Sequence, residues 1–217
     1  MYVIVNAAMS IDGKIATVTG DSRISSLADR RRVHKLRSSV DAIMVGISTV
    51  KEDDPMLNVR LIKSRKKNPV RIIIDSKARI PMNSRIMNTT HSHRTILAVS
   101  NSASKKRISE IQKRGVMVIK AGHDVVDLRL IFKTLEENGI NKILVEGGGE
   151  LNWSVLNLRL VKELIVTVSS KIIGGRDAKT LVEGIGFPRI RDAIKLRLQN
   201  AIYDEKEIVL YYKSLDD

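Results

Sequence analysis

The sequence predicts an α/β fold with a mixed, mostly parallel sheet, helices on both faces and an antiparallel C-terminal edge. Short apolar runs of strand length alternate along the chain with longer amphipathic runs of helical period, the pattern of a sheet covered by helices. Near the C-terminus three strand-like runs follow one another, and the polar turn Asp204–Lys206 joins the last two, which favours antiparallel pairing. No repeat, low-complexity tract or linker divides the chain, so residues 1–217 are expected to form a single domain.

In the first half of the chain, apolar runs bounded by turn residues predict strands. The first run, Tyr2–Ala8, leads into the turn-rich segment Ser10–Asp21. Ser25 or Ser26 can cap a helix through Arg30–Arg37, because a serine hydroxyl accepts a hydrogen bond from a free N–H of the first helical turn. The other predictions for this half are strands at Asp41–Val45, Val70–Asp75 and Thr95–Ser100 and an exposed basic loop at Lys63–Pro69.

In the second half, glycines mark the ends of predicted helices. Gly115 follows the amphipathic run Ala103–Arg114, and Gly139 follows Leu128–Glu137. Glycine is common after a helix because it adopts the left-handed backbone conformation without steric cost. The strands predicted in this half are Val116–Lys120, Ile143–Glu146, Leu164–Ser170, Leu196–Ile202 and Ile208–Tyr212.

Composition excludes several classes of protein. Apolar residues make up 43% and charged residues 29% of the chain, as in folded soluble proteins, and the apolar runs are far shorter than a membrane span. Polar residues interrupt any signal-peptide pattern at the N-terminus, so a cytoplasmic protein with no membrane partner is expected. The absence of cysteine excludes disulfides, a thiolate nucleophile and cysteine-ligated metals, and with them the zinc-dependent base deaminases.

The net charge of +14 raises the question of a nucleic-acid partner. The basic residues are scattered along the chain, and aromatic residues, on which bases stack, make up only 3%. An anionic small molecule fits this charge as well as a polymer does. We therefore expect an anionic small-molecule substrate and no nucleic-acid partner; that this substrate is phosphorylated is implied only by the family resemblance described below.

The strongest local signal is a glycine triplet at the end of a predicted strand. The strand Ile143–Glu146 runs directly into Gly147–Gly149, and an amphipathic helix is predicted to begin near Leu151. Glycine lets a ligand approach the backbone, and the free N–H groups at a helix start attract phosphate. An ordinary turn would need one glycine, so the triplet favours a diphosphate site, although it matches neither the G-x-G-x-x-G nor the Walker pattern. Glu146 either belongs to this site or caps a neighbouring loop.

The segment from Gly46 to Arg60 is the second signal. Thr49 and Asp53 lie four residues apart, so a short helix would place them on one face. Asp53 could accept a hydrogen bond from a ribose hydroxyl, Thr49 could donate to a phosphate, and Arg60 could pair with one. A capped turn followed by a solvated arginine is the structural alternative, and the segment alone does not decide between them.

Further signals follow other predicted strands. In the turn Asp75–Arg79, Ser76, Lys77 and Arg79 could hold a 2′-phosphate beside a nucleotide, or they could form a basic surface turn. Met9–Lys14 and Arg37 belong either to a site or to plain structure. The four histidines show no metal-ligand pattern, so no metal is expected.

Taken together, these segments resemble in order and spacing the C-terminal reductase domain of bacterial bifunctional riboflavin-synthesis proteins. They are more similar still to the stand-alone archaeal 2,5-diamino-6-ribosylamino-4(3H)-pyrimidinone 5′-phosphate reductases. The likeness covers nearly the whole chain, from Tyr2 to about Tyr212. The matching segments are Met9–Lys14, Asp21–Ser25, Val45–Val50 with Asp53–Pro55, Asp75–Lys77 with Arg79, Leu144–Gly149 and Lys171–Gly175.

The resemblance implies a dihydrofolate-reductase-like fold, NADPH as cofactor (with NADH as an alternative), a homodimer and two sets of site residues. With the basic turn and Gly122 included, the predicted cofactor residues are Ala8, Thr49, Asp53, Asp75, Ser76, Lys77, Arg79, Gly122, Gly147, Gly148, Gly149 and Glu150. The predicted substrate residues are Ser22, Arg37, Leu57, Arg60 and Glu146, with the arginines facing the phosphate. The chain departs from the family pattern at Glu150, where relatives often carry threonine or serine, and at Ser169–Ser170, which replaces Ala-Pro.

The implied reaction is hydride transfer to C1′ of the ribosylamine, which opens to an imine and becomes a ribityl chain. Glu146 and Asp53 are the candidate catalytic residues, because a carboxylate stabilises the iminium form. The competing hypotheses are a pterin or folate reductase on the same fold, a basic nucleic-acid-binding protein and a bifunctional deaminase–reductase. The absence of cysteine argues against the last.

Overall fold

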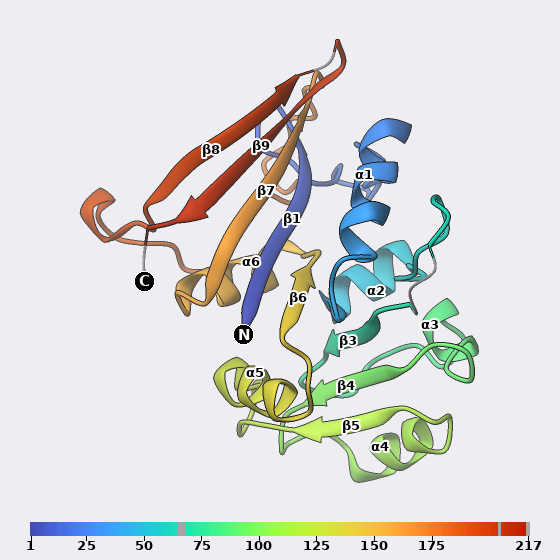
Figure 1. The fold of residues 1–217 in the computed structure, drawn as a ribbon. Helices are drawn as coiled ribbons and strands as arrows, with labels where there is room; N and C mark the ends of the chain where they lie inside the picture. Colours follow the sequence, from blue (N-terminus) through green and yellow to red (C-terminus); the bar gives the residue numbers. More distant parts are fainter. Residues whose placement is uncertain (65–67, 204, 216–217) are drawn as a thin grey trace. The chain divides into compact units, whose positions relative to one another are not determined.

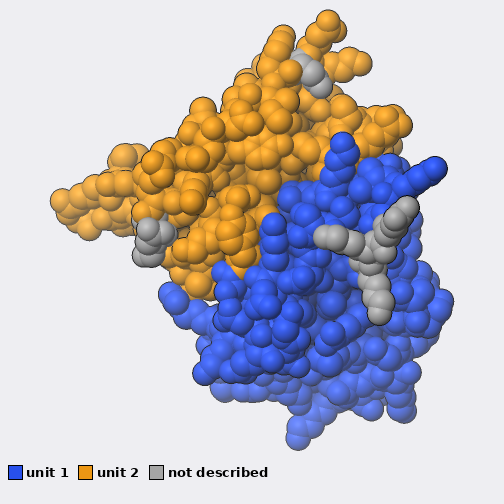
Figure 2. All heavy atoms as spheres, in the orientation of Figure 1, with its two compact units in different colours: residues 1, 34–144 blue, residues 2–33, 145–217 orange. Residues whose placement is uncertain are grey.

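The computed structural model describes residues 1–64, 68–203 and 205–215 (Figure 1). The chain divides into two compact units, shown in different colours in Figure 2. Unit 1 consists of Met1 and His34–Leu144, and unit 2 of Tyr2–Val33 and Val145–Asp217. The predicted loop Lys63–Pro69 and the predicted turn Asp204–Lys206 lie partly outside the described residues. The expectation of a single domain stays a prediction.

Unit 1 contains parallel strands in the order β5-β4-β3-β2-β6. The pairs β2–β3, β3–β4 and β4–β5 are parallel, as the alternation of strand and helix patterns predicts. The strands are β2 (Ala42–Gly46), β3 (Val70–Ile74), β4 (Thr95–Val99), β5 (Met117–Lys120) and β6 (Lys142–Val145), the last ending at the first residue of unit 2. The helices are α2 (Ile47–Asp53), α3 (Arg85–Asn88), α4 (Lys105–Gln112) and α5 (Leu128–Glu137).

These elements confirm the predicted strands and helices of unit 1 with small changes at the ends. The predicted helix Ala103–Arg114 is shorter, because Ser104 caps α4 by accepting a hydrogen bond from the Arg107 N–H at 3.4 Å. Gly115, with φ +80°, follows the helix, and its N–H donates to the carbonyl of Gln112.

The core of unit 1 lies between the strands and helices α2 and α4. Alternate strand residues such as Ile43, Ile73 and Leu97 pack with Val50 and Ile111 from these helices. Neighbouring residues of the strands are buried as well, since parallel sheets are covered on both faces. This arrangement explains why the strands are continuous apolar runs rather than alternating ones.

One buried cation in β3 was not predicted. Arg71 is fully buried, and its guanidinium donates to Thr95 Oγ1, to Thr89 Oγ1 and to the carbonyls of Ile86 and His93. Burial lowers the pKa of Arg71 to about 10. The side chain thus joins β3 and β4 to the end of α3 and the loop that follows it.

Unit 2 contains strands in the order β1-β7-β9-β8. β1 (Tyr2–Ser10) is parallel to β7 (Val161–Ser169), whereas β9 (Glu207–Ser214) is antiparallel to both β7 and β8 (Leu196–Tyr203). The predicted antiparallel C-terminal edge is confirmed. Its strand β7 is antiparallel to β9 but parallel to β1. Unit 2 also contains α6 (Gly149–Asn157) and a short 3₁₀ helix at Ile190–Asp192.

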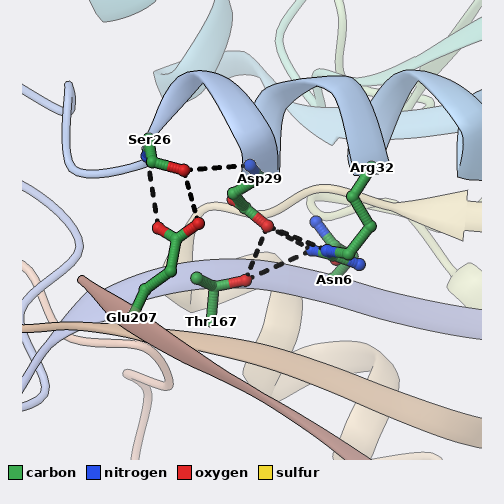
Figure 3. A network of polar contacts seen from close by, with 6 residues as sticks. All are labelled: Asn6, Ser26, Asp29, Arg32, Thr167 and Glu207. Atoms are coloured by element: carbon green, nitrogen blue, oxygen red, sulfur yellow. Dashed lines mark hydrogen bonds and ion pairs between the residues drawn. The ribbon is translucent and has the colours of Figure 1, made fainter. Parts of the chain in front are cut away.

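The helix α1 (Leu27–Arg37) begins in unit 2, and Ser26 caps it. The Ser26 hydroxyl accepts a hydrogen bond from the Asp29 N–H at 3.0 Å. Ser26 also donates its own N–H and hydroxyl to the Glu207 carboxylate of β9, which is buried (Figure 3). The structure therefore selects Ser26 from the two predicted capping residues.

Below this cap, a polar network ties the first turns of α1 to β1 and β7 (Figure 3). The buried carboxylate of Asp29 accepts hydrogen bonds from Thr167 Oγ1 and Arg32 Nε, both at 2.8 Å. Arg32 also donates to Asn6 Oδ1 at 2.8 Å. Because each buried polar group has a partner within the network, burial carries little penalty here.

None of the helices in the described ranges combines the length and the apolar content needed to cross a bilayer.

Candidate cofactor and substrate site

The predicted site residues are distributed over both units. Ala8, Ser22, Glu146 and Gly147–Glu150 belong to unit 2, and the remaining predicted residues belong to unit 1. The unit 2 residues lie on β1, in the loop after it and around the start of α6. The unit 1 residues lie on α1, on and after α2, and in the turns after β3 and β5.

The glycine triplet connects β6 to α6. Gly147 has φ +87°, and the peptide bond between Gly147 and Gly148 is cis. Gly148 is the N-cap residue of α6, which begins at Gly149, two residues earlier than predicted. The predicted strand-to-helix turn is therefore confirmed. Glu146 is half-buried just before the triplet, and Glu150 is exposed in the first turn of α6.

Two of these glycines have structural reasons to be glycine. The positive φ of Gly147 is unfavourable for other residues. A Cβ at Gly149 would lie 2.7 Å from the carbonyl oxygen of Thr180 and 2.7 Å from Cγ of Glu183, so a side chain does not fit there. The Glu183 N–H also donates to the carbonyl of Gly149. The number of glycines by itself therefore does not establish a ligand site.

Sequence reasoning missed Asn152, which lies behind the glycines in α6. Its side chain is fully buried, and Nδ2 donates to the carbonyl of Leu181 at 2.8 Å. The carboxamide oxygen Oδ1 is buried with no hydrogen-bond partner, 3.7 Å from the position of a Cβ on Gly147. An unpaired buried acceptor is costly, so this atom needs a donor from a ligand or a water molecule.

The other predicted residues of unit 2 lie on β1 and in the following loop. Ala8 is half-buried and pairs with Thr167 of β7. Ser22 is exposed, and its carbonyl accepts a hydrogen bond from the Ile24 N–H. Neither position suggests its role without the family resemblance.

In unit 1 the cofactor residues gather at the carboxyl ends of the parallel strands, where open α/β sheets place their ligands. Ser76 follows β3, and its hydroxyl accepts a hydrogen bond from the Val126 N–H at 3.1 Å. The carbonyl of Ser76 accepts the hydroxyl of Ser100, which follows β4. The structure thus brings the turns after β3, β4 and β5 together at this edge.

Asp75 is held beneath this edge. Its side chain is fully buried, and Oδ2 accepts a hydrogen bond from the Ile80 N–H at 2.8 Å. Burial raises the pKa of Asp75, with Arg79 Nε at 3.8 Å from Oδ1 partly opposing this effect. A side chain with no exposed surface can shape the turn that carries Ser76 and Lys77, but it cannot contact a bound cofactor directly.

Gly122, after β5, also has a structural reason to be glycine. It has φ +82°, and a Cβ would lie 2.2 Å from the carbonyl oxygen of Val125. Its own carbonyl accepts a hydrogen bond from the Asn101 N–H at 2.9 Å. Gly122 therefore fixes the turn between β5 and α5.

The predicted short helix after β2 is confirmed as α2, which contains both Thr49 and Asp53. Their spacing places them on one face, with Thr49 half-buried and Asp53 exposed. Asp54 ends the helix in the left-handed conformation, with φ 39°, and its Oδ1 accepts a hydrogen bond from the Arg85 N–H.

The predicted phosphate ligands Arg37 and Arg60 converge on one residue of the loop after α2. Arg37 Nη1 donates to the carbonyl of Asn58 at 3.1 Å, and Arg60 Nη1 donates to Asn58 Oδ1 at 2.8 Å. The buried His34 accepts a hydrogen bond from the Arg60 N–H at Nδ1, at 3.0 Å. Leu57 is buried, with φ 47°. The structure therefore brings Arg37, Leu57 and Arg60 together.

Asn58 and His34 were not predicted to belong to this site. No motif singles out Asn58, and His34 differs from the other histidines only in its burial. The contacts of Arg37 with Asn58 and of His34 with Arg60 join α1 to a distant loop, which local sequence does not reveal. Within the described ranges, no group of three histidine, aspartate or glutamate side chains lies in an arrangement that could hold a metal ion.

Comparisons with known proteins agree with this architecture. The family model described as "RibD C-terminal domain" matches residues 1–210. The chain is 46% identical over 212 residues to the 2,5-diamino-6-ribosylamino-4(3H)-pyrimidinone 5′-phosphate reductase of Methanothermobacter thermautotrophicus, covering 97% of each chain. It is 37% identical over 213 residues to the protein of the same name from Aquifex aeolicus, covering 96% of this chain and 94% of the other.

Among solved structures, the fold is similar to that of Acinetobacter baumannii RibD. The TM-score is 0.84 at 25% identity, over 98% of this chain and 57% of the other. This likeness confirms the predicted dihydrofolate-reductase-like fold class.

Proposed function

The chain belongs to the RibD C-terminal domain family of riboflavin-biosynthesis reductases, and on this premise we propose that it reduces 2,5-diamino-6-ribosylamino-4(3H)-pyrimidinone 5′-phosphate with NADPH. The observation that carries the proposal is the 46% identity over 97% of both chains to a reductase named for this substrate. The family is consistent with a nicotinamide cofactor, and the choice of NADPH rests on the basic turn after β3.

The convergence of Arg37 and Arg60 supports a phosphate subsite. Arginine presents a planar set of donors that matches phosphate geometry. Asn58 orients both guanidinium groups by accepting one hydrogen bond from each. An arginine held in this way loses less side-chain entropy when a phosphate binds.

Glu146 and Asp53 are proposed to stabilise the positive charge that develops when the ribosylamine opens to its imine. Glu146 follows β6, and Asp53 is exposed on α2. A fixed carboxylate stabilises an iminium in the transition state more than the neutral ring-closed sugar, which is the condition for acceleration. The bound nicotinamide supplies the hydride, so the chain has to orient the substrate carbon and hold the charge.

Each unit contains polar groups of the kind that a nicotinamide dinucleotide binds. In unit 2, the buried Oδ1 of Asn152 lacks a donor next to Gly147, and α6 begins immediately after the glycines. Free N–H groups at a helix start favour a phosphate. In unit 1, the exposed Lys77 and Arg79 supply cations for a 2′-phosphate. On this basis we propose that the predicted cofactor residues form the binding site, with Asp75 and Gly122 shaping the turns rather than contacting the ligand.

The assay of choice follows oxidation of NADPH and of NADH spectrophotometrically, with mass analysis of the product. We expect turnover with the ribosylamine phosphate and none with dihydrofolate. Turnover of dihydrofolate together with inertness toward the ribosylamine phosphate would reverse the assignment to a folate-type reductase.

Replacement of Arg60 tests the phosphate subsite. We expect Arg60→Ala to raise KM for the ribosylamine phosphate about ten- to hundredfold, as expected for loss of a hydrogen bond between charged groups, with little change in the affinity for NADPH. Arg129→Ala, in the exposed face of α5, is the matched control and should leave both constants unchanged. An unaltered KM in Arg60→Ala would remove Arg60 from the subsite.

A homodimer is part of the proposal, as the resemblance implies. The strand β8 supports it, because Leu198, Ile202 and Tyr203 are at least half exposed. An exposed edge strand with apolar side chains is commonly covered by a partner.

A further inference from the structure

A cation and an anion meet at the carboxyl edge of unit 1, on the turns after β3 and β5. Lys77 Nζ donates to Ser102 Oγ at 2.7 Å and lies 3.7 Å from Asp124 Oδ1. Both charged side chains are open to a ligand, with 49% of the Lys77 side chain and 68% of the Asp124 side chain exposed. The cluster Lys77–Ser102–Asp124 is thus formed by residues from three different turns.

Hydroxyl groups hold Lys77 in place. Ser100 donates its only hydroxyl proton to the carbonyl of Ser76 at 2.7 Å. Ser100 Oγ also lies 2.9 Å from Ser102 Oγ, and Ser102 accepts the hydrogen bond from Lys77. A chain of hydroxyls thus connects the ammonium group to the backbone of the β3 turn.

The carboxylate is held as well. Asp124 Oδ2 lies 2.9 Å from Nδ1 of His123, and this hydrogen bond, together with the nearby Lys77, lowers the pKa of Asp124. The carboxylate therefore stays charged at neutral pH. Arg79, the other cation of this edge, is 56% exposed and lies 3.8 Å from the buried Asp75.

NADPH and NADH differ only at the adenosine ribose, where the first has a 2′-phosphate and the second a 2′-hydroxyl. A cation recognises the phosphate, and a carboxylate accepts a hydrogen bond from the hydroxyl but repels the phosphate. This edge contains both kinds of group. A 2′-phosphate that pairs with Lys77 has to compete with Asp124 for it.

We propose that the Lys77–Ser102–Asp124 cluster determines the preference between NADPH and NADH. Lys77 is the ligand of the 2′-phosphate, and Asp124 limits the preference for NADPH by occupying Lys77 and by accepting the 2′-hydroxyl of NADH. The inference rests on the proposed use of a nicotinamide nucleotide. It predicts that the wild-type protein accepts both nucleotides, with a modest preference for NADPH.

The first test removes the cation. In Lys77→Met, the affinity for NADPH and for the fragment 2′,5′-ADP should fall about tenfold, whereas that for NADH and 5′-AMP should stay within about twofold. Lys133→Met, on the exposed face of α5, is the matched control and should change none of the four. Equal losses for all four ligands, or no loss, would overturn the role of Lys77.

The second test removes the competing anion. In Asp124→Asn, the affinity for NADPH and 2′,5′-ADP should rise about three- to tenfold, and that for NADH should fall. Glu137→Gln, at the exposed end of α5, is the control for loss of a surface carboxylate. An unchanged ratio of the NADPH and NADH affinities in Asp124→Asn would overturn the proposal for Asp124.

These measurements separate the inference from the proposed reaction, because the fragments bind without the pyrimidine substrate. If the nucleotide affinities of the variants shift as expected but the protein does not reduce the ribosylamine phosphate, only the proposed substrate is contradicted. If instead the protein reduces that substrate, and the two variants leave the ratio of its NADPH and NADH affinities unchanged, only this inference is contradicted.

Discussion

Asp75 is the residue whose environment has the clearest consequence for stability. Burial is the largest effect on its carboxyl and raises the pKa from the ordinary value of 3.8. The folded state then binds this proton more tightly than the unfolded state does. The contribution of Asp75 to the free energy of unfolding is thus complete below pH 3.8 and declines as pH rises from there through the folded pKa.

Asp75→Asn tests this dependence, because asparagine keeps an acceptor for the Ile80 N–H and carries no charge. We expect the stability of Asp75→Asn relative to the wild type to improve as pH rises from about 4 to 7. Urea unfolding at several pH values measures the difference. A relative stability that falls over this range would contradict the raised pKa.

Polar residues hold the cations of the proposed binding sites, Arg37, Arg60 and Lys77. Arg37 and Arg60 are oriented by one asparagine, and Lys77 is oriented by serine hydroxyls. In both places a neutral polar residue accepts a hydrogen bond from the cation and helps to position it. This is the arrangement expected of cations that bind an anionic ligand.

At the scale of an element, the start of α6 depends on close packing against the segment 180–183. In Gly149→Ala, the new methyl group would meet the Thr180 carbonyl oxygen at 2.7 Å, so this segment or the helix start must move. We expect a loss of stability of about 1–3 kcal/mol, typical of overpacking, together with weaker binding of NADPH.

Gly115→Ala is the appropriate comparison. Gly115 has φ +80° with nothing within 4 Å of a Cβ, so alanine there costs only the left-handed backbone, about 1–2 kcal/mol. It should leave the affinity for NADPH unchanged. Both variants are compared by thermal unfolding and by titration with NADPH; equal affinities in the two variants would show that the start of α6 takes no part in nucleotide binding.

At the scale of the whole molecule, the expected dimer can be tested by sedimentation equilibrium. We expect the wild type to be a dimer and Ile202→Glu to be monomeric, because a charge on the apolar surface of β8 opposes its burial. Leu130→Glu, at a partly exposed position of α5, is the control and should remain dimeric. A monomeric wild type would remove the dimer from the proposal.

The net charge of +14 also acts at this scale. It attracts anionic ligands of every kind, and so it does not distinguish a phosphorylated metabolite from a nucleic acid. The hydrogen bonds of Arg37, Arg60 and Lys77 hold individual cations in defined turns, which supports the proposed phosphorylated small molecule.

Local sequence patterns were sufficient to predict the family and the order and type of most elements, α3 and the short 3₁₀ helix excepted. Apolar periodicity and glycines depend on local geometry, so strands such as β3 and helices such as α5 were predicted closely. The antiparallel edge formed by β8 and β9 followed from the same patterns. The motifs from Met9 to Gly175 are linear as well, and so the family resemblance follows from the order of residues alone.

Which of these residues are exposed, and which distant residues meet, depends on how the strands and helices pack together. Asp75 and Arg79 share a basic turn in the sequence, yet one is fully buried and the other is more than half exposed. The pairing of Lys77 with Asp124 depends on the adjacent ends of β3, β4 and β5. Such contacts arise from the order of strands in the sheet, which non-local packing fixes and local periodicity does not contain.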